Sequence, residues 1–359
     1  MLPHAGLTGS VIYNTPGADR QSYISYNGSR EYITLAGVSL ELDTSGRLRA
    51  AYARSKVDRD LANTGVGISE RDLRRAVTIS YYRTLAARKL AEAAQAMLAE
   101  ALKFETRAKA LFEGGEAARA DVVKASAQVA TFDQFAQSTQ LDARLANQDL
   151  ASYWTTDVDK ALDLEDALSQ VMAEAAGVDP PAAYQRRLEF RLFDLQQQGF
   201  KLDAKRELAA LFPQVTLGFL HGVDSNRYAW NERGSAAIAT VNVPIFDWFR
   251  ARSLSQQFST KAQQVDTTRK ISDRVFSREY ESAQAKVKSI SLQVKSAEEQ
   301  VRLFEQNLTL SQVRYEGGEG PAAEVVQAQN QLQQARSNYF NTLFVLANAR
   351  ADLEVAAGR

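Results

Sequence analysis

The sequence predicts a mainly α-helical protein with a small β part, built from two internal repeats. The segment Glu-Gly-Gly-Glu occurs at 113–116 and again 203 residues later, at 316–319. A long stretch with heptad spacing of apolar residues precedes each copy, which predicts long antiparallel coiled-coil helices. Apolar residues alternate with other residues at 7–13, 32–42, 215–221 and 236–245, which is typical of β-strands. Similarity at a fixed offset indicates a repeated architecture.

The composition excludes several classes of function. The 359 residues include 43 Lys and Arg and 43 Asp and Glu, so there is no basic surplus to bind a nucleic acid. No apolar stretch reaches the ~18 residues that indicate a membrane-spanning helix. Cysteine is absent and His4 and His221 are the only histidines, which leaves little material for a catalytic triad or a metal centre. We expect no enzymatic activity, no cofactor and no metal site.

The first repeat covers 1–182 and begins with two strands predicted within 5–46. Residues 7–13 and 32–42 alternate around a polar loop, which predicts a β-hairpin. Strands of roughly 8–11 residues are long enough to cross a bilayer when they are tilted. The same pattern also fits a hairpin in an ordinary soluble protein.

A long helix is predicted at 47–112. Gly65 and Gly67 lie inside it, and glycine in a helix interior costs on the order of 1 kcal/mol, so we expect a kink or local unwinding there. With a rise of 1.5 Å per residue the helix would be roughly 100 Å long. Its last turns contain a heptad seam of Leu90, Ala94, Met97, Ala101, Phe104, Ala108 and Leu111.

This helix ends in a predicted tip at 113–117, where glycine can adopt the left-handed conformation that terminates a helix. A return helix is predicted at 118–154, antiparallel to the first because the connection is short. An equatorial connector is predicted at 155–182, and the Asp179-Pro180-Pro181 segment near its end breaks any helix.

The second repeat covers 183–359 and has the same order of elements after an additional helix at 183–211. Strands are predicted within 212–246, a long helix at 247–315, a tip at 316–320 and a return helix at 321–356. The first repeat has no counterpart of helix 183–211, so we expect that one N-terminal helix, with any export signal before it, is missing from this sequence. The second heptad seam consists of Val287, Ile290, Val294, Ala297, Val301, Phe304 and Leu308.

Four strands cannot close a barrel alone, and open strand edges cannot face lipid because unpaired backbone groups are costly there. Either the two hairpins form a sheet in a soluble protein, or several chains combine their strands. Three chains would supply twelve strands, an even number within the range of outer-membrane barrels. Twelve helices from the same three chains could form a closed hollow cylinder.

The chain resembles the TolC-like outer-membrane efflux proteins over essentially its whole length, apart from the missing first helix. The segments Leu2-Pro3-His4 and Phe212-Pro213-Gln214 are similar to the family's Leu-Pro-Gln step at a strand entry. Pro244-Ile245-Phe246-Asp247 matches the family's pattern at a strand exit, whereas Glu41 replaces the proline in the first copy. The two glycine tips, in the right order and spacing, complete the resemblance.

This resemblance implies a homotrimer. Its strands would form a twelve-stranded β-barrel in contact with outer-membrane lipid, and its helices an α-barrel that extends into the periplasm. The channel would be the exit duct of a tripartite efflux or type I secretion system. A periplasmic adaptor protein would join it to an inner-membrane pump, and it would passively conduct small molecules or polypeptides.

The resemblance also assigns candidate site residues at the tips. Gly320 stands where the family has the arginine partner of its gate, so the gate pattern is incomplete. Turn geometry explains the glycines equally well, and the helix dipole explains the acids. The adaptor would bind Gly114, Gly115, Glu116, Gly317, Gly318 and Glu319, and the periplasmic gate would consist of Phe112, Asp121, Tyr315 and Glu324.

Two other classes of protein are alternatives. A soluble coiled-coil scaffold would account for the heptads but not for the recurrence of both hairpins. A periplasmic adaptor would also contain a helical hairpin. Adaptors have a single hairpin, however, and they carry glycine-rich lipoyl-like and barrel domains that are not found in this sequence.

Overall fold

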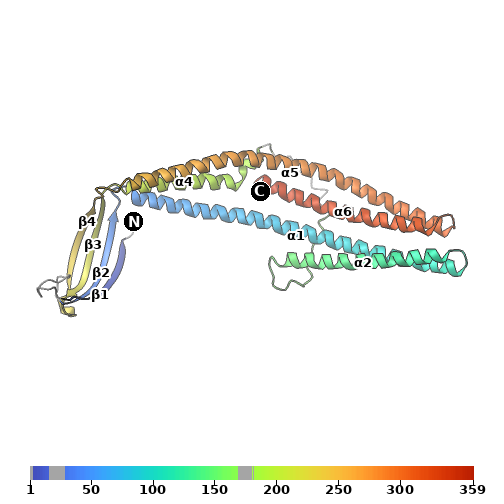
Figure 1. Ribbon diagram of the computed structural model, residues 1–359, viewed down its shortest axis with the longest axis horizontal. Coiled ribbons are helices and arrows are strands. Elements are labelled where there is room, and N and C mark those ends of the chain that lie inside the picture. Colours follow the sequence, from blue (N-terminus) through green and yellow to red (C-terminus); the bar gives the residue numbers. More distant parts are fainter. Residues whose placement is uncertain (1–2, 16–28, 169–179, 181) are drawn as a thin grey trace. The chain divides into compact units, whose positions relative to one another are not determined.

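The computed structural model describes residues 3–15, 29–168, 180 and 182–359, and it is mostly helical with one four-stranded sheet (Figure 1). Within these residues, no helix is both long and apolar enough to cross a membrane. In chain order the elements are β1 (His4–Tyr13), β2 (Arg30–Leu42), α1 (Arg47–Glu113), α2 (Arg119–Ala151), η1 (Ala183–Arg186), α4 (Leu188–Ala209), β3 (Gln214–Ser225), η2 (Trp230–Glu232), β4 (Gly234–Asn242), α5 (Arg250–Glu316) and α6 (Ala322–Ala356).

The chain forms two compact units. The first consists of Met1–Thr64 and Arg191–Arg269, and it holds the sheet with the adjoining parts of α1, α4 and α5. The second consists of Gly65–Phe190 and Lys270–Arg359, and it holds α2, α6 and the remaining parts of the long helices. Each unit therefore combines segments from both halves of the sequence.

The sheet of the first unit is antiparallel, and its strands lie in the order β1-β2-β3-β4. Residues that face each other across neighbouring strands share one face of the sheet. β1 and β4 are the edge strands, and in the described part of the chain neither pairs with a further strand. The register places these large apolar residues on one face: Leu7, Val11, Tyr32, Val38, Leu40, Val215, Leu217, Phe219 and Val241.

The strand ends differ from those predicted. β3 continues to Ser225, well beyond the alternating stretch at 215–221. β4 ends at Asn242, although the alternation runs to Ile245, because Pro244 has no N–H to donate to a ladder. The predicted loop between the first two strands falls mainly on 16–28, which lie outside the described residues.

Most residues of the two heptad seams are buried in the core of the second unit, and the others are half-buried: Leu90, Leu111, Ile290, Val301 and Phe304. In α1, Ala94, Met97, Ala101, Phe104 and Ala108 are each at most 5% exposed. The seam of α5 and the inner faces of α2 and α6 pack in the same clusters. The helices bury an apolar stripe against a neighbour, which contributes on the order of 2 kcal/mol for each large side chain.

The expected interruption of the first long helix does not occur. Helical hydrogen bonding is continuous through Gly65 and Gly67. A Cβ atom added to Gly67 would lie 3.0 Å from Leu188 Cδ1, so the glycine allows the start of α4 to pack closely against α1. Tertiary packing therefore overrides the low helix propensity of glycine here.

Two predicted helix starts are also displaced. Residues 183–186 form a 3-10 turn, and Arg187 (φ −59°, ψ 132°) leaves the helical region, so α4 begins at Leu188 instead of 183. The second long helix begins at Arg250 instead of 247, because Trp248 and Phe249 have left-handed φ values of 56° and 62°.

The return helix α2 ends at Ala151, before the predicted residue 154, and the connector that follows contains neither helix nor strand over its described residues 155–168. The buried side chain of Asn147 is hydrogen-bonded to the backbone of this connector. Its Nδ2 donates to Lys160 O at 3.0 Å, and its Oδ1 accepts from Leu162 N at 3.2 Å. Residues 169–179 and 181 of the predicted connector lie outside the described residues.

Candidate functional site

The candidate site consists of the turn between α1 and α2 and the turn between α5 and α6. In the first, Glu116 N donates to Leu111 O at 2.9 Å and Gly115 N donates to Phe112 O at 3.0 Å. In the second, Glu319 N donates to Arg314 O at 2.9 Å and Gly318 N to Tyr315 O at 3.1 Å. This pair of bonds is the Schellman motif, which satisfies carbonyl groups at a helix end.

Only the second glycine of each pair is required by the turn. Gly115 (φ 78°) and Gly318 (φ 72°) are left-handed, which glycine adopts without a steric penalty. Gly114 and Gly317 do not have positive φ, and added Cβ atoms would lie 3.5 Å and 3.4 Å from the nearest carbonyl oxygens. All four glycines, together with Glu116 and Glu319, are exposed.

The two predicted gate aromatics have different environments. Phe112 is 43% exposed, whereas Tyr315 is 6% exposed and packs edge-on against Phe104 with ring centroids 5.2 Å apart. Within the described residues the buried Tyr315 hydroxyl has no hydrogen-bond partner. Burial raises the pKa of Tyr315, and the carboxylate of Asp121 raises it further, so the structure brings these two predicted residues near each other.

The acids Asp121 and Glu324 occupy equivalent places, in the first turn of α2 and of α6. There the positive end of the helix dipole stabilises a carboxylate, as the sequence suggested. Their charge partners differ. Lys124 Nζ lies 3.5 Å from Asp121 Oδ1, whereas Arg314 Nη1 lies 2.8 Å from Glu324 Oε2.

Arg314 is a candidate site residue that the sequence analysis missed. Besides its ion pair with Glu324, its Nη2 donates to Glu319 O at 3.4 Å, so one guanidinium contacts both sides of the second turn. An arginine is therefore present beside the acid, although Gly320 stands at the position to which the resemblance assigns the gate arginine. Alignment of the two repeats at their offset of 203 residues would have singled out Arg314, because the equivalent residue of the first repeat is the uncharged Leu111.

Polar contacts connect the two helical hairpins near the tips. Gln128 Nε2 donates to Asn330 Oδ1 at 2.7 Å between α2 and α6, and Gln312 Nε2 donates to Glu100 Oε1 at 3.0 Å between α5 and α1. These contacts supplement the shared apolar core that contains Phe104, Tyr315 and Leu332. The tips are thus held by a mixed apolar and polar interface.

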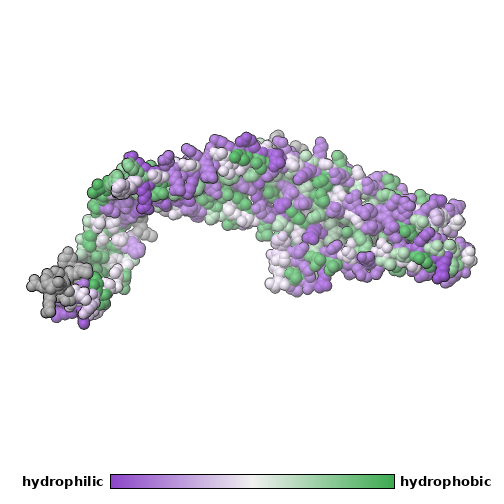
Figure 2. All heavy atoms as spheres, viewed as in Figure 1, coloured by the Kyte–Doolittle hydropathy of each residue, from purple (hydrophilic) through white to green (hydrophobic). Residues whose placement is uncertain are grey.

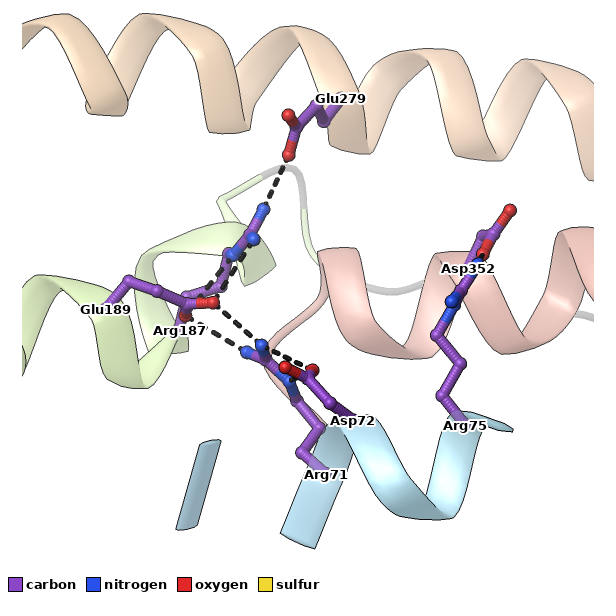
Figure 3. A network of polar contacts seen from close by, with 7 residues as sticks. All are labelled: Arg71, Asp72, Arg75, Arg187, Glu189, Glu279 and Asp352. Carbon is purple, nitrogen blue, oxygen red and sulfur yellow. Dashed lines mark hydrogen bonds and ion pairs between the residues drawn. The ribbon is translucent and has the colours of Figure 1, made fainter. Parts of the chain in front are cut away.

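A second polar site, shown in Figure 3, connects α1, the start of α4, and α5. Arg71 donates two hydrogen bonds to the carboxylate of Glu189, at 2.8 Å and 3.0 Å, and Arg187 donates one to the same carboxylate at 3.3 Å. Arg187 Nη1 also donates to Glu279 at 2.8 Å, and its guanidinium lies 3.8 Å from the centre of the Phe276 ring. The sequence analysis missed this network because its members are up to 208 residues apart.

The electrostatics of Glu189 reflect this network. Burial by itself would raise the pKa of its carboxyl, but hydrogen bonds from Arg71, from the backbone N–H of Glu189 and from Arg187 outweigh burial and lower the pKa to about 2. The carboxylate is therefore ionised at every physiological pH and serves as a structural anchor. Nearby, Arg75 Nε donates to Asp352 Oδ1 at 2.7 Å and ties α1 to α6.

Comparison with known proteins gives one family. A family model described as "Outer membrane efflux protein" matches residues 180–359. No curated protein matches the sequence.

Several solved structures share the fold. The outer membrane protein VceC of Vibrio cholerae has a TM-score of 0.80 and 15% identity, over 99% of this chain and 87% of that protein. The CmeC outer membrane channel of Campylobacter jejuni has the same score and identity, over 99% of this chain and 78% of that one. A membrane protein of Pseudomonas aeruginosa has a TM-score of 0.83 and 17% identity, with coverages of 99% and 84%.

Proposed function

Because the chain belongs to the outer membrane efflux protein family, we propose that it is the outer-membrane exit duct of a tripartite efflux or type I secretion system. It would conduct small molecules or polypeptides passively from an inner-membrane pump across the periplasm and the outer membrane. The two repeats, 1–182 and 183–359, would each contribute two strands to a barrel and one helical hairpin to a tunnel. Family membership favours this function over a soluble scaffold or an adaptor.

The observation that carries the proposal is the open sheet. One chain supplies four strands, and the outer edges of β1 and β4 lack partners among the described residues. Leu7 on β1 and Val241 on β4 are 76% and 59% exposed on the apolar face. A sheet can place its apolar face in lipid only if the backbone N–H and C=O groups of its two edge strands are hydrogen-bonded to further strands. Three chains would close them with twelve strands.

Cross-linking tests this arrangement. The chain has no cysteine, so the double variant Thr8→Cys, Thr240→Cys carries one thiol on each edge strand, on the same face of the sheet. A short bifunctional maleimide should produce covalent trimers in outer-membrane fractions, because β1 of one chain would lie beside β4 of the next. Thr8→Cys with Thr216→Cys on the interior strand β3 is the control and should remain largely monomeric. A monomer in gentle detergent, or a protein that stays out of the membrane, would contradict the proposal.

The tips are the proposed docking and gating region. The exposed residues Gly114–Glu116 and Gly317–Glu319 would contact the periplasmic adaptor. In a trimer, three copies each of Asp121 and Glu324 would surround one axis. Such a ring of acids favours cations and repels itself, so opening should depend on pH and salt.

Replacement of Arg314 by alanine tests the gate. The ion pair with Glu324 is half-exposed, and pairs of this kind contribute at most about 1 kcal/mol, so the open probability should rise by up to about fivefold. Single-channel recording in planar bilayers measures it, and the effect should shrink at high salt. Lys124→Ala at the first tip is the matched control and should change the open probability less. An unchanged open probability of Arg314→Ala at low salt would show that this ion pair has no part in closure.

A further inference from the structure

An ion pair between Arg75 on α1 and Asp352 on α6 joins the two helical hairpins of the chain (Figure 3). We call α1 with α2 the first hairpin and α5 with α6 the second hairpin. Arg75 donates to Asp352 Oδ1 from Nε at 2.7 Å and from Nη2 at 2.5 Å. These charge-assisted hydrogen bonds fix the position of α1 against α6 at this point.

The internal repeat places the same two residue types at the equivalent positions. Addition of the offset of 203 residues takes Arg75 to Arg278 on α5, and its subtraction takes Asp352 to Asp149 on α2. This second pair is not formed within the chain. Arg278 is exposed and has no ion pair among the described residues, whereas Asp149 contacts Arg83 of its own hairpin at 3.1 Å. The chain therefore carries two complementary charges that it does not itself bring together.

Asp352 shows which partner such an aspartate takes when cations of both hairpins are near. The equivalent of Arg83 in the second hairpin is Lys286, which lines the same cavity as Asp352. Asp352 nevertheless pairs with Arg75 of the other hairpin. The contact between Arg83 and Asp149 is weak, because their side chains are 58% and 59% exposed. We therefore expect Asp149 to exchange Arg83 for an arginine of a neighbouring hairpin.

The helix faces that carry the two arginines differ in burial. On α1, Ala86 and Met97 follow Arg75 at intervals of 11 residues, which keeps them on its face of the helix. They are 8% and 2% exposed and lie in the clusters that α1 shares with the second hairpin. Their equivalents on α5, Ser289 and Gln300, are exposed. This face of α5 thus lacks the neighbour that covers the equivalent face of α1.

Exposed apolar side chains accompany both unmatched charges. On α5, Ile271 and Leu292 lie seven residues before and fourteen after the arginine, a heptad spacing, and they are 52% and 59% exposed. On α2, Leu145 and Leu141 precede the aspartate by four and eight residues and are 45% and 55% exposed. Figure 2 shows hydrophobic residues among hydrophilic ones on the surface of the helices. Apolar side chains grouped around a charge indicate a surface that a partner covers.

We propose that α5 of one chain docks along α2 of a second copy, with Arg278 of the first chain paired to Asp149 of the second. The contact repeats between two chains the one that Arg75 and Asp352 make within a chain. It joins different faces of the two copies, and head-to-tail contacts of this kind close into rings. The docking rests on the proposed function, because a ring of three chains supplies every Arg278 with one Asp149.

Cross-linking tests the pairing in the full-length chain, which has no cysteine of its own. Arg278→Cys and Asp149→Cys are introduced into separate chains that are produced together, and outer-membrane fractions are treated with a bifunctional maleimide. Covalent dimers should form only when both variants are present. Arg75→Cys with Asp352→Cys in one chain is the matched control, because these positions are paired within the chain. It should give an internally linked chain that migrates as a monomer.

Charge reversal tests the ion pair itself. Arg278→Asp would place two carboxylates against each other, so trimers should dissociate several-fold faster in detergent, and less so at high salt. Addition of Asp149→Arg should restore part of the trimer lifetime, because opposite charges then face each other again. Lys295→Asp is the matched control and should not change the dissociation rate. Its equivalent on α1, Glu92, is exposed even though α1 contacts α6, so this position lies outside the contact.

Three results would overturn the docking. They are the absence of dimers from the separate cysteine chains while the control becomes linked, equal dissociation rates for Arg278→Asp and Lys295→Asp, and no recovery on addition of Asp149→Arg. In each case trimers linked through Thr8→Cys and Thr240→Cys would leave the proposed function standing. Absence of covalent oligomers from both cross-links would overturn the proposed function and the docking together.

Discussion

Valine at both Gly115 and Gly318 is expected to abolish export while trimers still assemble. Both glycines have left-handed φ values, 78° and 72°. This conformation costs a residue with a Cβ atom roughly 1–2 kcal/mol, and β-branched residues tolerate it least. Valine would break the Schellman bonds from Glu116 to Leu111 O and from Glu319 to Arg314 O, so the proposed adaptor surface would lose its shape. The sheet and the heptad seams are unchanged, and assembly should persist.

The first glycine of each pair provides the matched control. Gly114→Ala with Gly317→Ala adds Cβ atoms that meet carbonyl oxygens at ordinary contact distances of 3.5 Å and 3.4 Å. Export of a fluorescent pump substrate from cells, at equal levels of outer-membrane trimer, should be normal for the alanine pair and absent for the valine pair. Normal export by the valine variant would show that the tip geometry is dispensable. Equal losses in both variants would show that the effect is not specific to the left-handed positions.

Replacement of Glu189 by glutamine is expected to destabilise the second compact unit by about 3 kcal/mol at neutral pH. Lowering a carboxyl pKa from 4.5 to about 2 corresponds to stabilisation of about that size. Its side chain is 17% exposed and that of Arg71 is 10% exposed, so little solvent screens the pair. Glutamine leaves Arg71 and Arg187 without their shared carboxylate, which is costly at a buried position. Circular dichroism in detergent should show a melting midpoint lower by several degrees.

The pH dependence tests the cause of this effect. A carboxyl whose pKa is lower in the folded protein stabilises the fold above its unfolded pKa of 4.5, and this stabilisation is lost as pH falls through about 2. The parent protein should therefore lose stability over that interval, and its difference from Glu189→Gln should disappear at the acid end. Glu70→Gln is the control, because Glu70 is exposed and precedes Arg71 in the chain. A constant difference between parent and Glu189→Gln at all pH values would assign the effect to packing instead of charge.

The long helices and the tips could be predicted from the sequence because their signals are local. The heptad seam from Ala94 to Ala108 repeats every two helical turns, and it is buried as its spacing predicts. The positions of Gly115 and Gly318 at the ends of helices follow from the left-handed conformation that terminates a helix. The prediction of local unwinding at Gly65 and Gly67 was wrong, because helical hydrogen bonding continues through both residues. The approach of Leu188 to Gly67 shows why glycine is found at that one position.

The sequence by itself determined the helical class, the two strand hairpins, the turn geometry and the family resemblance, because each depends on residues close together in the chain. The tertiary structure alone decided which charges meet: Arg71 with Glu189, and Arg314 with Glu324 across a turn. It also decided that Tyr315 is buried while its counterpart Phe112 is exposed, and that the backbone is strained at Trp248 and Phe249. These properties depend on how close segments of the chain come to one another in space. The sequence does not state those distances, so the properties are known only once the packing of the helices is known.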